Sequence, residues 1–254
     1  MNWLRLLHGI FEYAIKREWV QANPCKLVDK PHVEPDTDTR FLTQPEVEAL
    51  LRKVPDDVLG PTERVLYLAA TMTGMRQGEL RALRWRDIDW MAGRVRVRRN
   101  YVRGEYGTPK SKRSSRSVPL ADRVAGDLER HYQASAYQAD EDLVFCHPHT
   151  GNPIDNSKLL RRFKDALEAA ELRTLRFHDL RHTFGTRMAA AGVPMRTLQE
   201  WMGHRNLATT LVYADYSPSA QEAEMVERAL ANPGVQSGAQ NERNSGDLSE
   251  PHTA

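Results

Sequence analysis

The sequence predicts a mostly helical α+β chain with one small, three-stranded antiparallel sheet. Apolar residues recur at helical spacing over much of its length, as Leu180, Phe184 and Met188 do at every fourth position. The period changes to alternation in GRVRVRR at 93–99, where valines and arginines take turns as in a half-buried strand. With 254 residues the chain can bury a full core and form one large domain, or one and a part.

The composition favours a protein of the reducing cytoplasm. Cys25 and Cys146 fit neither a disulfide framework nor a zinc site. No apolar run is long enough to span a membrane, and the amphipathic start does not resemble a secretory signal. We therefore expect a cytoplasmic location and no membrane partner.

The charge of the chain is segregated, although its formal net value is only +2. Residues 94–116 carry nine Lys or Arg and a single acid, Glu105, whereas the stretch from Asp215 onward carries seven acids and two arginines. A charge run alone is usually a solvated face. A basic hairpin nonetheless suits a phosphate backbone, and the segregation makes nucleic acid a candidate partner.

The first part of the chain predicts a helix, a linker and the start of a larger domain. Residues 2–18 form an amphipathic helix, and 29–40 have the Pro, Asp and Thr composition of an exposed linker. The capping-box pattern from Thr43 to Glu46 begins the next helix. The further elements that we expect are a helix at 61–72, a small sheet within 93–120, a helix at 121–132, a short strand at 143–146, and helices at 157–170 and 218–231.

The stretch from His178 to Tyr213 predicts a compact frame of three helices. Gly192 ends the first helix, and Gly203 closes the second. His204 then lies just past a helix end, where a side chain can point into a cleft, and Tyr213 follows on a short third helix.

Two arginines stand at informative places beside this frame. Arg181 lies three residues after His178 on the same helix face, and Gly185 leaves room beside them. Arg76 opens a helix after the break at Gly74, where a guanidinium can join the free N–H groups of a helix start in holding an anion. Each residue alone has an ordinary structural interpretation, and only the ordered set suggests a site.

In this order, Arg76, His178, Arg181, His204 and Tyr213 resemble the tyrosine recombinase (phage integrase) family. The surrounding segments LRWRDID, HDLRHTFGT and WMGHRNLATTLVYA match its pattern too. The resemblance implies the DNA breaking-rejoining enzyme fold, with a helical catalytic domain. It also implies that the chain cleaves and rejoins duplex DNA as a site-specific recombinase or integrase, with no metal and no other cofactor.

The resemblance assigns a role to each site residue. Tyr213 is the expected nucleophile, which forms a 3′-phosphotyrosine and releases a 5′-hydroxyl. Arg76 and Arg181 would bind the negative charge of the phosphate under attack, because a guanidinium is forked and always charged. His178 would help to take the tyrosine proton, and His204 would hydrogen-bond a phosphate oxygen.

The basic hairpin is expected to supply the general acid and contacts to DNA. A hairpin lysine protonates the leaving oxygen in this family, and TPKSKRSSRSVPL matches that pattern at Lys110, with Lys112 as the rival. Glu79, one turn beyond Arg76, would orient that arginine or form a surface ion pair. The residues that we expect to contact DNA are Arg94, Arg96, Arg98, Lys112, Arg113 and Arg116.

The family pattern also predicts domains and partners. Residues 1–28 resemble only the last helix of the family's core-binding domain, so we expect a truncated domain there, the linker at 29–40, a catalytic domain at 41–231 and a disordered tail at 232–254. The expected partners are duplex DNA in the nucleoid and further copies of the chain, joined as a homotetramer through helix 218–231. The pattern leaves room for an accessory DNA-bending protein.

Other functions stay open at this point. A type IB topoisomerase uses a similar residue set but relaxes supercoils as a monomer without preferred sites. A DNA-binding remnant of a mobile element would lack catalysis. A phosphomonoesterase could use the histidines and arginines, but it gives no reason for the tyrosine or for the basic hairpin.

Overall fold

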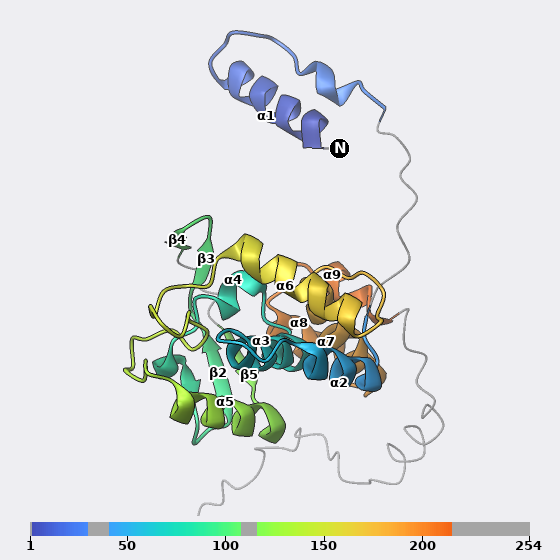
Figure 1. Cartoon of the computed structure of the whole chain (residues 1–254). Helices are drawn as coiled ribbons and strands as arrows, with labels where there is room; N and C mark the ends of the chain where they lie inside the picture. The colour runs from blue at the N-terminus through green and yellow to red at the C-terminus, as the bar shows by residue number, and fades with distance from the viewer. Residues whose placement is uncertain (1, 30–40, 108–115, 215–254) are drawn as a thin grey trace, which may run out of the picture. The chain divides into compact units, whose positions relative to one another are not determined.

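The computed structural model describes residues 2–29, 41–107 and 116–214 (Figure 1). The chain divides into two compact units, residues 1–39 and 40–254. In the part of the chain that the structure describes, no helix is both long and apolar enough to cross a membrane. The predicted helix at 218–231 and the tail lie outside the described residues.

The first unit contains the expected amphipathic helix α1 (Asn2–Lys16) and the short 3-10 helix η1 (Pro24–Lys26). Asn23 joins them: its side chain donates to His8 O at 3.1 Å and to Glu12 Oε1 at 2.8 Å, and accepts from the Cys25 amide. A single helix cannot bury its own apolar stripe. Within this unit the large side chains of Trp3, Leu6, Leu7, Ile10 and Tyr13 accordingly stay exposed.

The second unit is built around helix α3 (Gly60–Thr73), nearly all of whose residues between Leu66 and Thr73 are buried. It contacts the helices α2 (Gln44–Lys53), α5 (Asp122–Ala134) and α7 (Asp179–Ala190). Its Tyr67 ring meets Phe163 and Phe177 edge to face at 5.2 and 6.0 Å between centroids. The other helices in the described part of this unit are α4 (Gln77–Leu80), α6 (Asn156–Ala169), α8 (Met195–Met202) and α9 (Ala208–Leu211), with the 3-10 helix η2 (Trp85–Asp87).

The predicted start of the main domain is confirmed. Thr43 precedes α2, and its amide donates to Glu46 Oε2 at 2.7 Å, which closes the expected capping box. The helices predicted at 61–72, 121–132 and 157–170 correspond to α3, α5 and α6.

The small three-stranded antiparallel sheet is also confirmed, although its first strand lies before residue 93, and a separate hairpin is added to it. Among the described residues of the second unit, the strands are β1 (Ile88–Asp89), β2 (Arg94–Val97), β3 (Asn100–Val102), β4 (Glu105–Gly107) and β5 (Arg116–Pro119). The sheet has the order β1-β2-β5, and Val95, which faces Val118, is buried with Val97 while Arg96 is exposed. Strands β3 and β4 form a separate two-stranded hairpin with Tyr101 opposite Tyr106.

The predicted strand at 143–146 is wrong. Leu143 and Cys146 form only isolated bridges, to Arg84 and Pro153 respectively. The run is apolar because Val144 and Phe145 are buried in the core, and burial produces an apolar run in irregular backbone as well as in a strand.

Candidate active site

Arg76 is held at the turn between α3 and α4. Gly74 ends α3 with φ at 62°, and a Cβ there would lie 2.4 Å from the Phe184 ring, so conformation and space both require glycine. Arg76 is then the N-cap residue of α4, and its amide donates to Glu79 Oε2 at 2.8 Å. Arg76 Nη1 donates to the other oxygen of the same carboxylate at 2.9 Å. The contact expected between Glu79 and Arg76 is therefore present.

Three arginines from different elements donate hydrogen bonds to consecutive carbonyl groups at the end of α8. These bonds run from Arg116 Nε to Trp201 O (2.6 Å), from Arg181 Nη2 to Met202 O, and from Arg76 Nη2 to Gly203 O (3.0 Å). The last carbonyls of a helix have no partner within the helix and form its negative end, so guanidinium groups stabilise them in both respects. The main chain thus gathers three cationic side chains at one point.

The gathered cations leave an excess of positive charge. Arg181 is only 3% exposed, and burial together with the charges of Arg76 and Arg116 lowers its pKa to about 9. Burial raises the pKa of Glu79, but hydrogen bonds and charges from Arg116 and Arg76 outweigh it and lower that pKa to about 2. One carboxylate does not balance the charge of three guanidinium groups, so the cluster can bind a further anion. The Arg76 side chain is 41% exposed and is therefore accessible to such an anion.

Tyr213 closes the other side of the site. The residue is 2% exposed, and its hydroxyl lies 2.9 Å from His182 Nδ1. Gly185 on α7 makes this possible, because a Cβ there would lie 2.5 Å from the ring. The room that the sequence predicted beside Gly185 is filled by the tyrosine. The ring belongs to a small apolar cluster with Phe184, Ala189, Leu198 and Met202.

His204 lies beside Tyr213, just past the Gly203 end of α8, as predicted. The two rings are nearly parallel, 14° apart, with centroids at 6.4 Å. Nδ1 of His204 hydrogen-bonds the fully buried Thr210 hydroxyl at 2.9 Å. Burial, aided by Arg181 and Arg76, lowers the pKa of His204 to about 3, so the ring is neutral at physiological pH. When Nδ1 accepts from the threonine, Nε2 carries the proton and can donate it to an anion.

His178 is the N-cap residue of α7 and is exposed. Its ring meets His182 edge-on, at 5.1 Å between centroids and 87° between planes. Among the described residues, no hydrogen bond joins His178 to Tyr213. His182 is the residue that the sequence analysis missed, and its only signal was the spacing of four from His178 on one helix face.

The arginines expected to contact DNA fall into two groups. Arg94, Arg96 and Arg98 are partly exposed, and Arg96 pairs with Asp89 at 2.5 Å. Arg116 points inward: its side chain is 6% exposed and donates two hydrogen bonds to Glu79, at 2.8 and 2.7 Å. From that position we expect it to act on Glu79 rather than directly on DNA. The remaining predicted residues, Lys110, Lys112 and Arg113, lie outside the described part of the chain.

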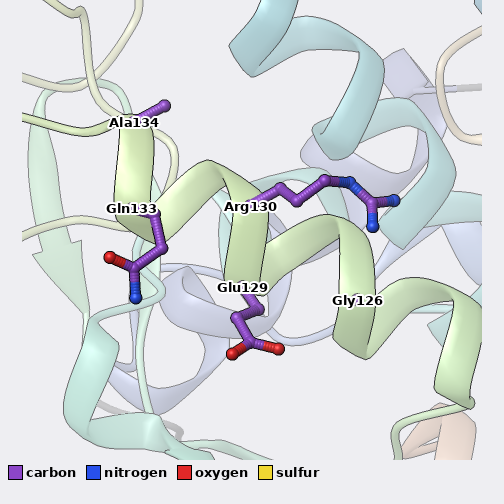
Figure 2. A pocket seen from close by; sticks show the side chains of 5 residues that line it. All are labelled: Gly126, Glu129, Arg130, Gln133 and Ala134. Carbon is purple, nitrogen blue, oxygen red and sulfur yellow. The ribbon is translucent and has the colours of Figure 1, made fainter.

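A hollow of about 520 Å³ lies along α5 (Figure 2). All of its lining residues come from this one helix, and Figure 2 shows the side chains of Glu129, Arg130 and Gln133 fanning outward rather than converging. Arg130 pairs with Asp127 of the same helix. A surface of this kind holds no set of converging polar groups, so it is no candidate for a ligand site.

With this fold and this arrangement of residues, the chain belongs to the phage integrase family, whose pattern matches residues 40–219. It is similar to the tyrosine recombinase XerC-like protein of Caldanaerobacter subterraneus subsp. tengcongensis, with 31% identity covering 80% of this chain and 58% of that protein. It is also similar to the ICEBs1 integrase of Bacillus subtilis, with 28% identity covering 87% and 62%. The chain thus spans about three-fifths of the length of these relatives.

Solved structures share the fold. The Tn1549 transposon integrase in complex with circular intermediate DNA matches with a TM-score of 0.66 and 23% identity, covering 91% of this chain and 79% of that one. A lambda integrase dimer bound to a core site matches with a TM-score of 0.62 and 15% identity, covering 94% and 75%. Both relatives were solved on DNA, and the mostly helical fold with a small antiparallel sheet is common to them and to this chain.

Proposed function

We propose that this protein is a site-specific DNA recombinase or integrase, which cleaves and rejoins duplex DNA through a 3′-phosphotyrosine link. The observation that supports the proposal most is the placement of a single tyrosine hydroxyl, on a histidine, beside three gathered arginines. Membership of the phage integrase family and the similarity to recombinases add to it.

In the proposed reaction the Tyr213 oxygen attacks a backbone phosphorus atom. The phosphate becomes five-coordinate, and its non-bridging oxygens gain negative charge. Arg76 and Arg181 bind these oxygens through charged hydrogen bonds, and His204 donates another from Nε2. Because carbonyl groups already hold the guanidinium groups in place, little reorganisation is needed when the charge develops.

The bond from phosphorus to the 5′-oxygen then breaks, and the oxygen leaves with the electron pair. It needs a proton, since an alkoxide is a poor leaving group, and we propose Lys110, or its rival Lys112, as the donor. The new phosphotyrosine ester conserves the energy of the broken ester bond. A 5′-hydroxyl from another strand can therefore reverse the step, with neither ATP nor a metal in this account.

We further propose that duplex DNA in the nucleoid of the cytoplasm is the substrate and that the active assembly is a homotetramer. The segment 218–231 carries Ala223, Val226 and Leu230 at helical spacing, which suits exchange of a helix between neighbouring copies. An accessory DNA-bending protein is a further candidate partner.

The test uses a nicked duplex that loses a short 5′-hydroxyl fragment once it is cleaved, so that the covalent product accumulates. We expect an SDS-resistant adduct with the full chain and none with Tyr213→Phe, which keeps the ring and its packing but removes the nucleophilic oxygen. Phe at this position tests the chemistry without opening a cavity. An adduct formed by Tyr213→Phe at the wild-type yield would rule the proposal out.

A further inference from the structure

If the proposed function holds, some group must accept the proton of Tyr213. The structure points to that acceptor more specifically than the family pattern does. Burial raises the pKa of the Tyr213 hydroxyl, although the charges of Arg181 and Arg76 act against this. The hydroxyl therefore keeps its proton at neutral pH, and a neighbouring group must accept it as the bond to phosphorus forms.

Three histidines are candidates for this acceptor, and their geometry differs. His204 stacks parallel to the Tyr213 ring and has its Nδ1 on the Thr210 hydroxyl. His178 is exposed and reaches only the edge of His182. His182 alone among the three has a ring nitrogen on the phenol oxygen, at 2.9 Å. A proton acceptor must lie within hydrogen-bond distance of the proton that it takes, and only His182 meets this condition here.

The surroundings of His182 keep it able to accept. Burial lowers its pKa, Asp179 raises it, and Arg176 and Arg181 lower it again. The ring is therefore neutral at pH 7, with Nδ1 free to accept from the hydroxyl while Nε2 carries the ring proton. The titratable and charged groups that face His182 from α7, from the turn before it and from the 204–213 segment are Arg176, His178, Asp179, Arg181, His204 and Tyr213.

We propose that His182 is the catalytic residue that accepts the proton of Tyr213 during DNA cleavage. The O–H bond of Tyr213 breaks, an N–H bond forms at His182 Nδ1, and the freed electron pair of the oxygen makes the bond to phosphorus. The 5′-oxygen leaves with the electron pair of its own bond and takes a proton from the general acid. On rejoining, His182 returns its proton to the tyrosine, so both groups end the cycle as they began.

The exposed location of His178 indicates a role other than accepting the proton of Tyr213. It lies one turn before His182 on α7 and at the opening of the helix, so its edge-on contact with the ring of His182 can hold that ring toward Tyr213. His178 is then a positioning residue for the proton transfer, in addition to any contact with the phosphate.

The first test measures the rate of covalent adduct formation against pH with the full chain and the nicked duplex, for wild type, His182→Asn and His178→Asn. Asparagine places an acceptor near the position of Nδ1 but cannot take up a proton. We expect His182→Asn to reduce the rate of adduct formation by a factor of about 10²–10⁴ at pH 7, the range typical of general base catalysis. Its rate should then rise steadily with pH, whereas the wild type loses activity through an acid midpoint below pH 6.5. His178→Asn should keep that acid midpoint, whatever its rate.

A second measurement tests the contact without DNA and without catalysis. Tyr213 is replaced by 3-fluorotyrosine in the full chain, and its fluorine resonance is followed from pH 8 to pH 4. In wild type the signal should shift with an acid midpoint, because protonation of His182 removes the acceptor. His182→Asn and His182→Gln should both lose the midpoint, and His178→Asn should keep it. Similar melting temperatures of the variants will exclude misfolding as the reason.

The two measurements separate the possible failures. An active wild type with an acid midpoint that persists in His182→Asn, in rate or in resonance, would overturn the role of His182 and leave the recombinase function standing. A wild type that forms no adduct, while its fluorine signal still reports His182, would overturn the proposed function and the catalytic role together.

Discussion

The two sides of the candidate site are built on different principles. On the arginine side, charged groups are fixed by main-chain carbonyls: Arg181 reaches Gly74 O and Met202 O, and Arg76 reaches Gly203 O. On the histidine–tyrosine side the groups are neutral, because burial lowers the pKa of His204 to about 3 and raises that of Tyr213. One side is prepared to bind charge, and the other is prepared to move a proton.

The difference explains how opposite demands can meet within one site. A cluster of guanidinium groups favours an anion and disfavours any further cation nearby. Burial lowers the pKa of His182 and of His204, and the charges of the arginines lower it further, so both rings stay unprotonated. Loss of an arginine should change the binding of charge, whereas displacement of the tyrosine should change only the geometry of attack.

Arg181→Ala should have the largest effect on the arginine side. It removes a preorganised donor and leaves the carbonyls of Gly74 and Met202 without their partner, so we expect cleavage to slow by about 10²–10³ and the melting temperature to fall. Single-turnover cleavage and thermal unfolding measure the two effects. Arg181→Lys should recover only part of the rate, because lysine lacks the fork that spans two carbonyls. Full recovery with lysine would show that charge alone suffices.

Gly185→Ala tests the tyrosine side on its own. The new methyl would lie 2.5 Å from the Tyr213 ring, which must move, and a displacement of about 1 Å can cost about 10² in rate. Because the arginine side is untouched, we expect the affinity for uncleaved DNA to stay at the wild-type value while the adduct forms more slowly. A parallel loss of DNA affinity would mean that the two sides are not separable as described.

The smallest effect concerns acid stability, and the pH range in which acid destabilises the fold differs between the two sides. The folded pKa of His204, about 3, lies below the ordinary value of about 6.5, so the unfolded chain binds a proton first and stability falls as the pH drops below about 6.5. Glu79 stabilises the fold above its ordinary pKa of about 4.3, and this contribution is lost only as the pH falls through about 2. Between pH 6.5 and 5, acid should therefore weaken the histidine side alone.

Urea unfolding at pH 7.5 and pH 5.5 measures this dependence. We expect the free energy of unfolding to fall toward pH 5.5 and to fall less in His204→Asn. The slope of this free energy against pH should be smaller in the variant by the equivalent of up to about one bound proton per molecule. Glu79→Gln should lower stability at both values of pH alike. An unchanged pH dependence in His204→Asn would contradict the assignment.

Much of the frame could be predicted from sequence because its signals are local. Thr43 and Glu46 form a capping box whatever the rest of the chain does, and Gly203 adopts the left-handed conformation that a helix end requires. Spacing along one chain segment sufficed for each of these.

The parts that the sequence did not predict depend on contacts between distant segments. Arg116 lies in a basic run and was expected to face DNA, yet its side chain turns inward. There it donates to the buried carboxylate of Glu79, 37 residues earlier, and to Trp201 O. His182 was missed because its partner Tyr213 lies 31 residues later, in the turn after α9 rather than on the short helix where the sequence placed it. Residues 143–146 likewise have the apolar pattern of a strand, but they are buried in the core without forming one.

The central claim is that Tyr213 is the residue that becomes joined to DNA, and mapping of the covalent product tests it most directly. The adduct formed by the full chain on a nicked duplex is digested with protease and nuclease, and the modified peptide is sequenced by mass spectrometry. We predict a single modified peptide, with a nucleotide joined through its 3′-phosphate to Tyr213. A nucleotide on any other residue, or a link through a 5′-phosphate, would contradict this assignment.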